Sequence, residues 1–562
     1  MKRTNISILV TGIVTIFFLI LMLLPHTTII NRPLIGLHDM DNGHLLTTVY
    51  LWRHEGIQKH SFAPIYSFPP ADLNLRAWGL VGKNNRMYHA SYPPLSFWLV
   101  YATSFVPTVG VTEATAHFAS LGVFIIALLF LFLYLCVTYN FPTALFGTGL
   151  FSLVPASVYF FGGLIVADIA VFAFWIPAFV FYSFSFRFKK PLFLLFSCLF
   201  LGLSVLSEWI GFLAATSLLI FLGILLIQER QKKQKARETF SHKNIYAFHP
   251  SIFVGSLIAT IVPLIITATV YLSIASPQLL VDFLRNKYLS RGNLVPTLVA
   301  LGKDHGPKGN IFDGISVWFE RVLHGYLWVE FTPLFWSIIA ISICTIGTLV
   351  IYQKSARPKS EILKYIFARI QADNWLIAVF FVFPPLLHTI LLSQFHYLHD
   401  YSFLSYLPFF TLVASKGFFA ITTFMQTTHF AHWRTQKILP LVIAIVILFW
   451  FYIGAQKTYR FFFFDETGGY PPTLHMFEVA RENTDPNDLI LTHHTYNPDI
   501  WFYLRRNAIQ WVVEAKDIAA YSGYYPLFPH VYYVGNYRPF VDNVCGKRAL
   551  RPVGEGWMCQ IK

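Results

Sequence analysis

The sequence has little charge for its length. Of its 562 residues, only 12% are Asp, Glu, Lys or Arg. A soluble protein carries about a quarter charged residues. Apolar residues make up 55% of the chain and gather into runs of about twenty, the length that crosses a bilayer core as a helix. The scarcity of charge therefore excludes an ordinary soluble protein and indicates a polytopic membrane protein.

Acidic residues are scarcer than basic ones, 28 against 42, which leaves a net charge of +14. Many basic residues lie in short segments between apolar runs. Three segments are distinctly basic: "RFKK" at 187–190, "QERQKKQKAR" at 228–237 and "YQKSARPKSEILKYIFAR" at 352–369. The positive-inside rule places such loops in the cytoplasm. We therefore attribute the excess of basic residues to membrane topology, and we expect no nucleic-acid partner.

Cysteine is also scarce, with five in the chain. Cys136, Cys198 and Cys344 lie within apolar runs and are expected to pack as small apolar residues. Cys545 and Cys559 are the two in the C-terminal tail. A pair in an oxidising compartment predicts a disulfide, which places the tail outside the cytoplasm.

The apolar runs are the candidate membrane spans. They cover residues 6–24, 94–109, 115–137, 142–160, 164–184, 191–209, 211–227, 251–274, 332–352, 374–394, 404–424 and 438–456. The first follows Lys2 and Arg3 and lacks a small-residue cleavage site, so we interpret it as a retained helix with a cytoplasmic N-terminus. If every run crossed, the basic segments would lie outside. The short run 94–109, bounded by prolines, is therefore predicted not to cross.

With that run removed, the polar features share the outer face. The outer segments are loops 26–93 and 275–331 and the C-terminal tail. The sequence predicts a transmembrane domain over 1–456 and a small extracytoplasmic α/β domain over 457–562. The fold class is an α-helical polytopic membrane protein with about 11–13 transmembrane helices.

Several motifs follow one another on this outer face. The first loop holds "GLHDMDNGHLLTTVYLWRHEG" at 36–56 and "YHASYPPLSFW" at 88–98. Later come "IVADIAVFAFW" at 165–175, "HYLHDYSFLSYLPFF" at 396–410 and "NTDPNDLILTHHTYNPDIWFYLRR" at 483–506. In order and spacing the chain resembles the GT-C glycosyltransferases of the protein O-mannosyltransferase and lipid A aminoarabinose transferase type, a family 39-like pattern. The resemblance implies a GT-C-like fold in a prokaryotic cytoplasmic (inner) membrane.

The resemblance also implies a reaction and its residues. A sugar would pass from a polyprenyl-phosphate carrier to an acceptor hydroxyl on a protein, glycan or lipid, by inverting direct displacement at the outer face. Asp41 matches the first acid of the family's Asp-Glu pair and is the expected base, while Asp168 matches the lone aspartate of a later span. The second acid of the pair is Asn42 here. Asp39 either substitutes for that acid or caps the helix expected to start near Gly43.

Departures and further candidates complete the expected site. The aminoarabinose branch has Glu-Lys before its prolines, where this chain has Ser91 and Tyr92, so that pair's role does not transfer. Arg285, Lys287 and Arg291 lie outside against the charge rule, which indicates either a phosphate clamp or headgroup contact by an amphipathic helix. His399 is a further candidate for the clamp.

The remaining candidates are Glu208, His396 and Asp400. Glu208 lies at the turn "SEWIG" and is either functional or a solvated corner. His396, His399 and Asp400 hold a divalent metal, or hydrogen-bond one another or the donor. No other cofactor is expected beyond the lipid-linked sugar donor and surrounding membrane lipids.

Other classes remain open on sequence grounds. A lipid-linked oligosaccharide ligase or flippase would differ mainly in donor size. A secondary transporter would also carry intramembrane acids, with internal repeats. A non-catalytic membrane scaffold is the third alternative.

Overall fold

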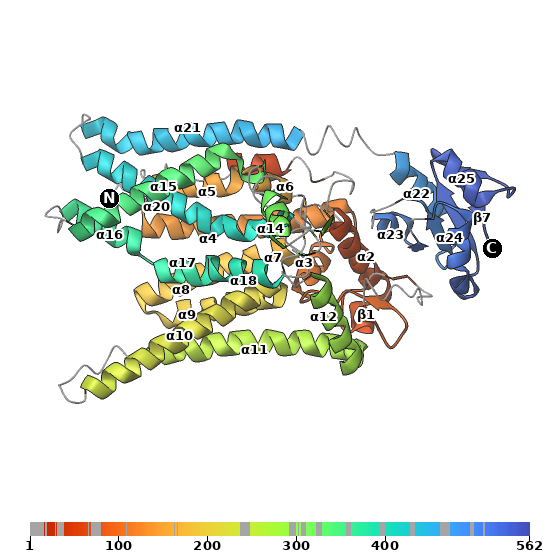
Figure 1. The fold of residues 1–562 in the computed structure, drawn as a ribbon, viewed down its shortest axis with the longest axis horizontal. Coiled ribbons are helices and arrows are strands. Elements are labelled where there is room, and N and C mark those ends of the chain that lie inside the picture. The colour runs from red at the N-terminus through yellow and green to blue at the C-terminus, as the bar shows by residue number, and fades with distance from the viewer. Residues whose placement is uncertain are drawn as a thin grey trace.

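The structure is a computed structural model, and it describes most of the chain. The described residues are 16, 20–27, 30, 39–65, 67–68, 80–107, 110–161, 163, 165, 167–236, 248–291, 299, 301, 303–304, 311–321, 329–355, 361–392, 400–427, 433–460, 472–494, 499–509 and 512–562. Long helices run side by side in a bundle, and a mixed α/β unit stands at one end of it (Figure 1).

The bundle is built from long apolar helices. They are α4 (Glu113–Thr138), α5 (Phe141–Leu153), α6 (Pro155–Phe160), α7 (Ala167–Ala170), α8 (Phe172–Phe188), α9 (Pro191–Ser207), α10 (Trp209–Ala236), α11 (Phe248–Ile274), α15 (Val329–Ser355), α16 (Glu361–Gln371), α17 (Asn374–Phe381), α18 (Phe383–Leu391), α20 (Leu407–Thr427) and α21 (Trp433–Arg460). Among the described residues, seven helical segments are long and apolar enough to cross a membrane by length and composition. The predicted polytopic helical class is confirmed.

The centre of the bundle is the segment 167–188, formed by α7 and α8. It is the most buried of the candidate spans, with 89% of its apolar window inside the protein. Helices α4 and α9 pack against it. Aromatic rings such as Trp175 and Phe179 pack against Phe381 of α17 in edge-on and tilted arrangements. This packing brings the end of α18 close to α7, although the two lie far apart in the sequence.

Proline and basic residues set some element boundaries differently from the sequence prediction. The run 142–160 breaks at Pro155 into α5 and α6, because an interior proline removes a hydrogen bond and clashes with the preceding turn. The basic segment after 227 continues α10 to Ala236 instead of forming a loop. Lysine, arginine and glutamine are good helix formers, so the helix extends beyond its apolar part.

Helix α3 (Leu95–Thr103) is the core of the run predicted not to cross. Its nine residues rise roughly 14 Å at 1.5 Å per residue, about half of a bilayer core. This length supports the prediction that the run 94–109 does not cross the membrane. If the run does not cross, the basic segments and Asp168 lie at opposite ends of the bundle.

A layer of further helices and a short strand pair lies at one end of the bundle (Figure 1). It contains α2 (Asp39–Glu55), η1 (Ile57–His60), the antiparallel pair β1 (Leu80–Val81) and β2 (Met87–Tyr88), α12 (Pro277–Arg291), α14 (Ile311–Phe319) and η3 (Asp400–Tyr406). Gly56, which ends the "HEG" motif after α2, has φ +91°, a conformation that favours glycine. In Figure 1, α2, α12 and β1 lie at the right, whereas α16 lies at the left.

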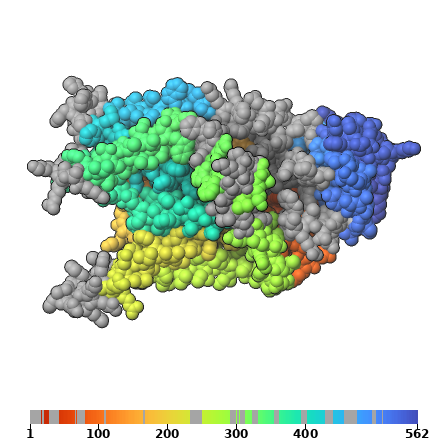
Figure 2. Space-filling view, in the orientation of Figure 1, coloured from red at the N-terminus to blue at the C-terminus, as the bar shows by residue number. Residues whose placement is uncertain are grey.

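The C-terminal residues form a mixed sheet with helices. Its elements are α22 (Pro472–Glu482), β3 (Leu489–Thr492), α23 (Asp499–Leu504), β4 (Asn507–Ile509), α24 (Ala515–Ala520), η5 (Ser522–Leu527), β5 (Val531–Gly535), α25 (Arg538–Cys545), β6 (Arg551–Val553) and β7 (Gly556–Gln560). The strand order is β4-β3-β5-β7-β6, with β4, β3 and β5 parallel and β7 and β6 antiparallel. The predicted disulfide between Cys545 and Cys559 is confirmed. In the space-filling view this unit forms a lobe beside the bundle (Figure 2).

Candidate functional site

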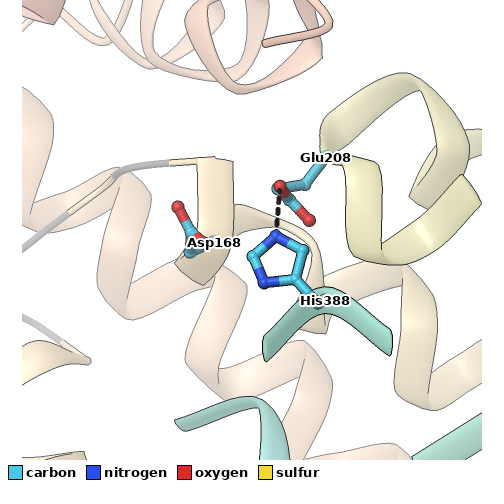
Figure 3. Close-up of side chains that lie close together, drawn as sticks. All are labelled: Asp168, Glu208 and His388. Carbon is cyan, nitrogen blue, oxygen red and sulfur yellow. Dashed lines mark ion pairs between the residues drawn. The ribbon is translucent and has the colours of Figure 1, made fainter. Parts of the chain in front are cut away.

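Three ionisable side chains from distant parts of the chain meet inside the bundle. Asp168 belongs to α7, Glu208 lies between α9 and α10, and His388 belongs to α18. One ligand atom from each lies within 4.8 Å of the others, and His388 Nε2 is 3.6 Å from Glu208 Oε1. Figure 3 shows the three side chains gathered around one point. We call these three residues the acid–histidine cluster.

Glu208 is held in place by a very short turn. It is the single extended residue between α9 and α10, with φ −162° and ψ 157°. Its carboxylate accepts a hydrogen bond from the backbone N–H of Ile210, in the first turn of α10. A carboxylate at a helix N-terminus is favoured by the helix dipole. Glu208 is 0% exposed, so the interpretation as a solvated corner is wrong.

Asp168 lies in the one-turn helix α7 and is 9% exposed. An ionisable side chain buried within an apolar run is costly and is usually retained for function. The segment just before it is fixed by Asn42 of α2. The Asn42 side chain donates to the carbonyl of Gly163 at 2.7 Å and accepts from the N–H of Ile165 at 3.0 Å.

This amide clamp explains the departure at position 42. A carboxylate there could accept from Ile165 but could not donate to Gly163, whereas an amide does both. The clamp ties the first turn of α2 to the segment that leads into Asp168. Asn42 thus positions the segment that precedes Asp168. The resemblance to the family, in which this position holds an acid, did not suggest that role.

Asp39 and Asp41 both belong to the first turn of α2. The helix begins at Asp39, four residues before the start expected near Gly43, so Asp39 does not cap a helix at Gly43. The side chains of both aspartates lie outside the described residues. Their backbone positions follow directly from the helix that Asn42 anchors beside residues 163 and 165.

A cavity of about 330 Å³ adjoins the acid–histidine cluster. His388 belongs to both. The lining of the cavity is mostly apolar and includes Ser91, Tyr92, Trp209, Phe212, Leu213, Leu284, Lys287, Tyr288, His388, Leu391 and Leu392. The cationic side chain in this lining is Lys287 of α12. An apolar wall with one ammonium group suits a ligand that joins a hydrocarbon chain to an anion.

Lys287 also acts on the α2 helix. Burial and, as a smaller cause, the positive charge of Lys287 together lower the pKa of His44 from 6.5 to about 4. His44 is therefore neutral at pH 7. Helices α2 and α12, which the sequence separates by more than two hundred residues, thus present groups that interact electrostatically.

The structure separates the predicted site residues. Asp168 and Glu208 meet, and Tyr92 and Lys287 line one cavity. Arg285 is exposed and is not among the residues that line the cavity. Asp400 begins η3, but its side chain, the side chain of Arg291, and residues His396 and His399 lie outside the described residues.

His388 was not predicted as a site residue. It stands alone in the apolar run 374–394, where a single histidine is usually a core residue that hydrogen-bonds its neighbours. The signal that could have found it is the one that found Asp168: a lone ionisable residue inside an apolar span. A second group with metal-binding geometry among the described residues is Asp485, Asp488 and His530 of the C-terminal unit, which is partly exposed.

Comparison with known proteins gives the fold. No protein-family model matches the chain, and no curated protein matches it significantly. The crystal structure of ArnT from Cupriavidus metallidurans bound to undecaprenyl phosphate is similar, with a TM-score of 0.54 and 11% identity over 98% of each chain. The Archaeoglobus fulgidus oligosaccharyltransferase complex with Zn and sulfate gives a TM-score of 0.46 and 13% identity, over 92% of this chain and 67% of that one. The likeness to ArnT shows that the chain shares its fold, the GT-C-like fold predicted from the sequence.

Proposed function

We propose that the protein is a membrane glycosyltransferase that moves a sugar from a polyprenyl-phosphate carrier to an acceptor hydroxyl at the outer membrane face. The observation that carries this proposal is the apolar cavity with Lys287 in its lining, next to the buried carboxylates of Asp168 and Glu208. The GT-C fold, shared with a protein whose crystal structure holds undecaprenyl phosphate, agrees with such a donor.

The chemistry asks for three kinds of group. A base must take the proton of the acceptor hydroxyl as its oxygen attacks the anomeric carbon. A cation must stabilise the phosphate that leaves with the carrier lipid. The site must also hold the sugar with the attacking oxygen opposite the phosphate, because one displacement inverts the anomeric centre.

We assign these roles to residues of the outer end. Asp41 is the base, since it lies in the turn of α2 that Asn42 anchors next to the segment preceding Asp168. Asp168 is a second carboxylate that orients the reacting groups. Lys287 binds the donor phosphate, with Tyr92 beside it in the cavity lining. A direct displacement forms one C–O bond, breaks one, and leaves no covalent glycosyl-enzyme.

The test is transfer by the purified protein, given a panel of polyprenyl-phosphate sugars and acceptor lipids, with donor consumption as the readout. Asp41→Asn is expected to lower turnover by about 10²–10⁴-fold, the usual loss on removing a general base. Asp39→Asn is the matched control in the same helical turn and should keep most activity. Near-normal turnover in Asp41→Asn would remove Asp41 as the base, and no consumption of any donor would refute the function.

A further inference from the structure

We propose that Asp168, Glu208 and His388 bind one divalent transition-metal ion, Zn²⁺ or Mn²⁺. The first argument is geometric. In a tetrahedral site, metal bonds of about 2.0–2.2 Å hold neighbouring ligand atoms roughly 3.3–3.6 Å apart. His388 Nε2 and Glu208 Oε1 are 3.6 Å apart, and the three ligand atoms lie within 4.8 Å of one another. The pair of His388 and Glu208 is therefore near the separation found between ligands of one ion.

The second argument is the state of the Glu208 carboxylate. One oxygen is used by the backbone N–H of Ile210, whereas Oε1 is buried and accepts no hydrogen bond from any described residue. Buried polar atoms are normally satisfied, and each exception calls for an explanation such as an ion. In Figure 3 this carboxylate points toward His388, with Asp168 on the other side of the imidazole.

The third argument is charge. The carboxyl groups of Asp168 and Glu208 are both buried, and two carboxylates this close repel each other when both are ionised. A divalent cation supplies two positive charges at the point where they converge. The imidazole nitrogen decides the class of ion, because imidazole suits zinc and other transition metals whereas calcium and magnesium prefer oxygen.

The inference deepens the proposed function and rests on it in one respect. His388 belongs both to the acid–histidine cluster and to the cavity assigned to the donor. An ion held there would lie beside the donor phosphate and add its positive charge to that of Lys287. Metal binding itself is measured without any donor, so the two proposals can fail separately.

The experiment measures the ion directly. Protein purified in detergent and treated with a chelator is titrated with Mn²⁺, free Mn²⁺ is counted by electron paramagnetic resonance, and Zn²⁺ is then added as a competitor. All variants carry His530→Gln, which removes a ligand of the second group, Asp485, Asp488 and His530. We expect one Mn²⁺ per chain in this background, displaced by Zn²⁺.

Two further substitutions test the ligands. Glu208→Gln keeps an oxygen for the N–H of Ile210 and so separates the metal from the helix cap, while His388→Gln removes the imidazole. Each should weaken binding by at least about 100-fold, because loss of an outer-sphere partner alone costs about 10–100-fold. Absence of binding in the His530→Gln protein, or unchanged affinity in both ligand variants, would overturn the inference. Glu361→Gln, which removes an exposed carboxylate at the start of α16, is the control for nonspecific effects.

Discussion

At the scale of single residues, the three cations predicted on α12 separate into different environments. Lys287 lines the cavity, Arg285 is exposed, and the side chain of Arg291 is not described. Sequence spacing could not make this distinction, because it depends on which side of α12 faces the cavity that residues of α10 and α18 also line. The two described cations give a matched pair for testing donor binding.

Lys287→Met is expected to weaken binding of a polyprenyl phosphate by about 10–100-fold, since a charge-assisted contact contributes roughly 1.5–3 kcal/mol. Arg285→Met, two residues earlier on the same helix, should bind like the parent. Tryptophan fluorescence is a suitable readout, because Trp209 lines the same cavity. Equal losses in both variants would mean that the membrane-surface charge of α12 matters, as in the headgroup interpretation.

His44 gives a residue-scale prediction about pH. Its folded pKa of about 4 is below the ordinary value of 6.5, so the unfolded chain binds the extra proton first as the pH falls. Stability from His44 is therefore complete above pH 6.5 and is lost as the pH falls toward 4. His44→Gln should reduce the loss of thermal stability across this window, measured as the midpoint of unfolding at several pH values.

The matched control is His54→Gln, an exposed histidine on the same helix. His494 of the C-terminal unit also has a pKa of about 4 because it is buried. It therefore contributes to the pH dependence of stability in the same window, so the effect of His44 is read from the difference between the His44→Gln and His54→Gln proteins. Removing Lys287 should raise the pKa of His44, because the charge of Lys287 is the second cause, after burial, of the lowered pKa. A pH profile unchanged by His44→Gln would contradict the assignment.

Asp168 could be predicted from sequence alone as a buried, unusual carboxylate, whereas its partners could not. The turn "SEWIG" marks Glu208 as a candidate, but no local sequence pattern predicts that its side chain is buried. His388 lies 220 residues after Asp168 in the sequence and is brought close by aromatic packing of α8 against α17. Asn42 was visible only as a missing acid, because its partners at 163 and 165 lie in a segment without periodicity.

At the scale of elements, the turn between α9 and α10 decides where Glu208 points. The N–H of Glu208 bonds to the carbonyl of Ser204, and the N–H of Gly211 bonds to the carbonyl of Glu208. A Cβ at Gly211 would overlap the backbone of Ser204 and Val205. Only glycine allows the two helices to meet this closely, so the glycine and the carboxylate form one unit.

Gly211→Ala should therefore displace α10 and lower stability by about 1–3 kcal/mol, the usual cost of overpacking. It should also reduce Mn²⁺ binding if Glu208 is a ligand. Gly223→Ala in the same helix is the control, because its Cβ would meet only Phe253 at an ordinary 3.9 Å. Thermal unfolding in detergent checks the first effect, and equal midpoints for the two variants would refute it.

The sequence predicted the element types well where apolar runs were long. The helical spans and the short α3 follow from length and pattern. The errors arise where a helix gains or loses residues at its polar end, as in α10, or where a proline divides a run, as at Pro155. Such boundaries depend on neighbouring elements and are the least predictable feature of a sequence.

At the scale of the whole molecule, the C-terminal unit contacts α2, Phe68 and the start of α4, which lie at least 390 residues earlier in the sequence. The Asn507 amide accepts from the N–H of Phe68 at 3.0 Å and donates to its carbonyl at 2.7 Å. Arg505 stacks over the ring of Tyr50 at 4.2 Å, on the helix that carries Asp41. Tyr503 donates to Glu113 at the start of α4. The unit is thus positioned to hold α2 against the bundle.

Asn507→Asp tests this arrangement at the scale of the whole protein. A carboxylate can still accept from Phe68 but turns a second oxygen toward its carbonyl, so a buried donor is replaced by a repelling acceptor. The loss of about 1–3 kcal/mol should raise the rate of hydrogen exchange in α2 and β4 by about 5–150-fold, while β5 and β7 keep their protection. Asn543→Asp, at an exposed position of α25, is the control. Faster exchange throughout the sheet would mean that Asn507 stabilises the C-terminal unit itself. Faster exchange limited to α2 and β4, together with lower sugar transfer, would mean that this unit keeps Asp41 in its working position.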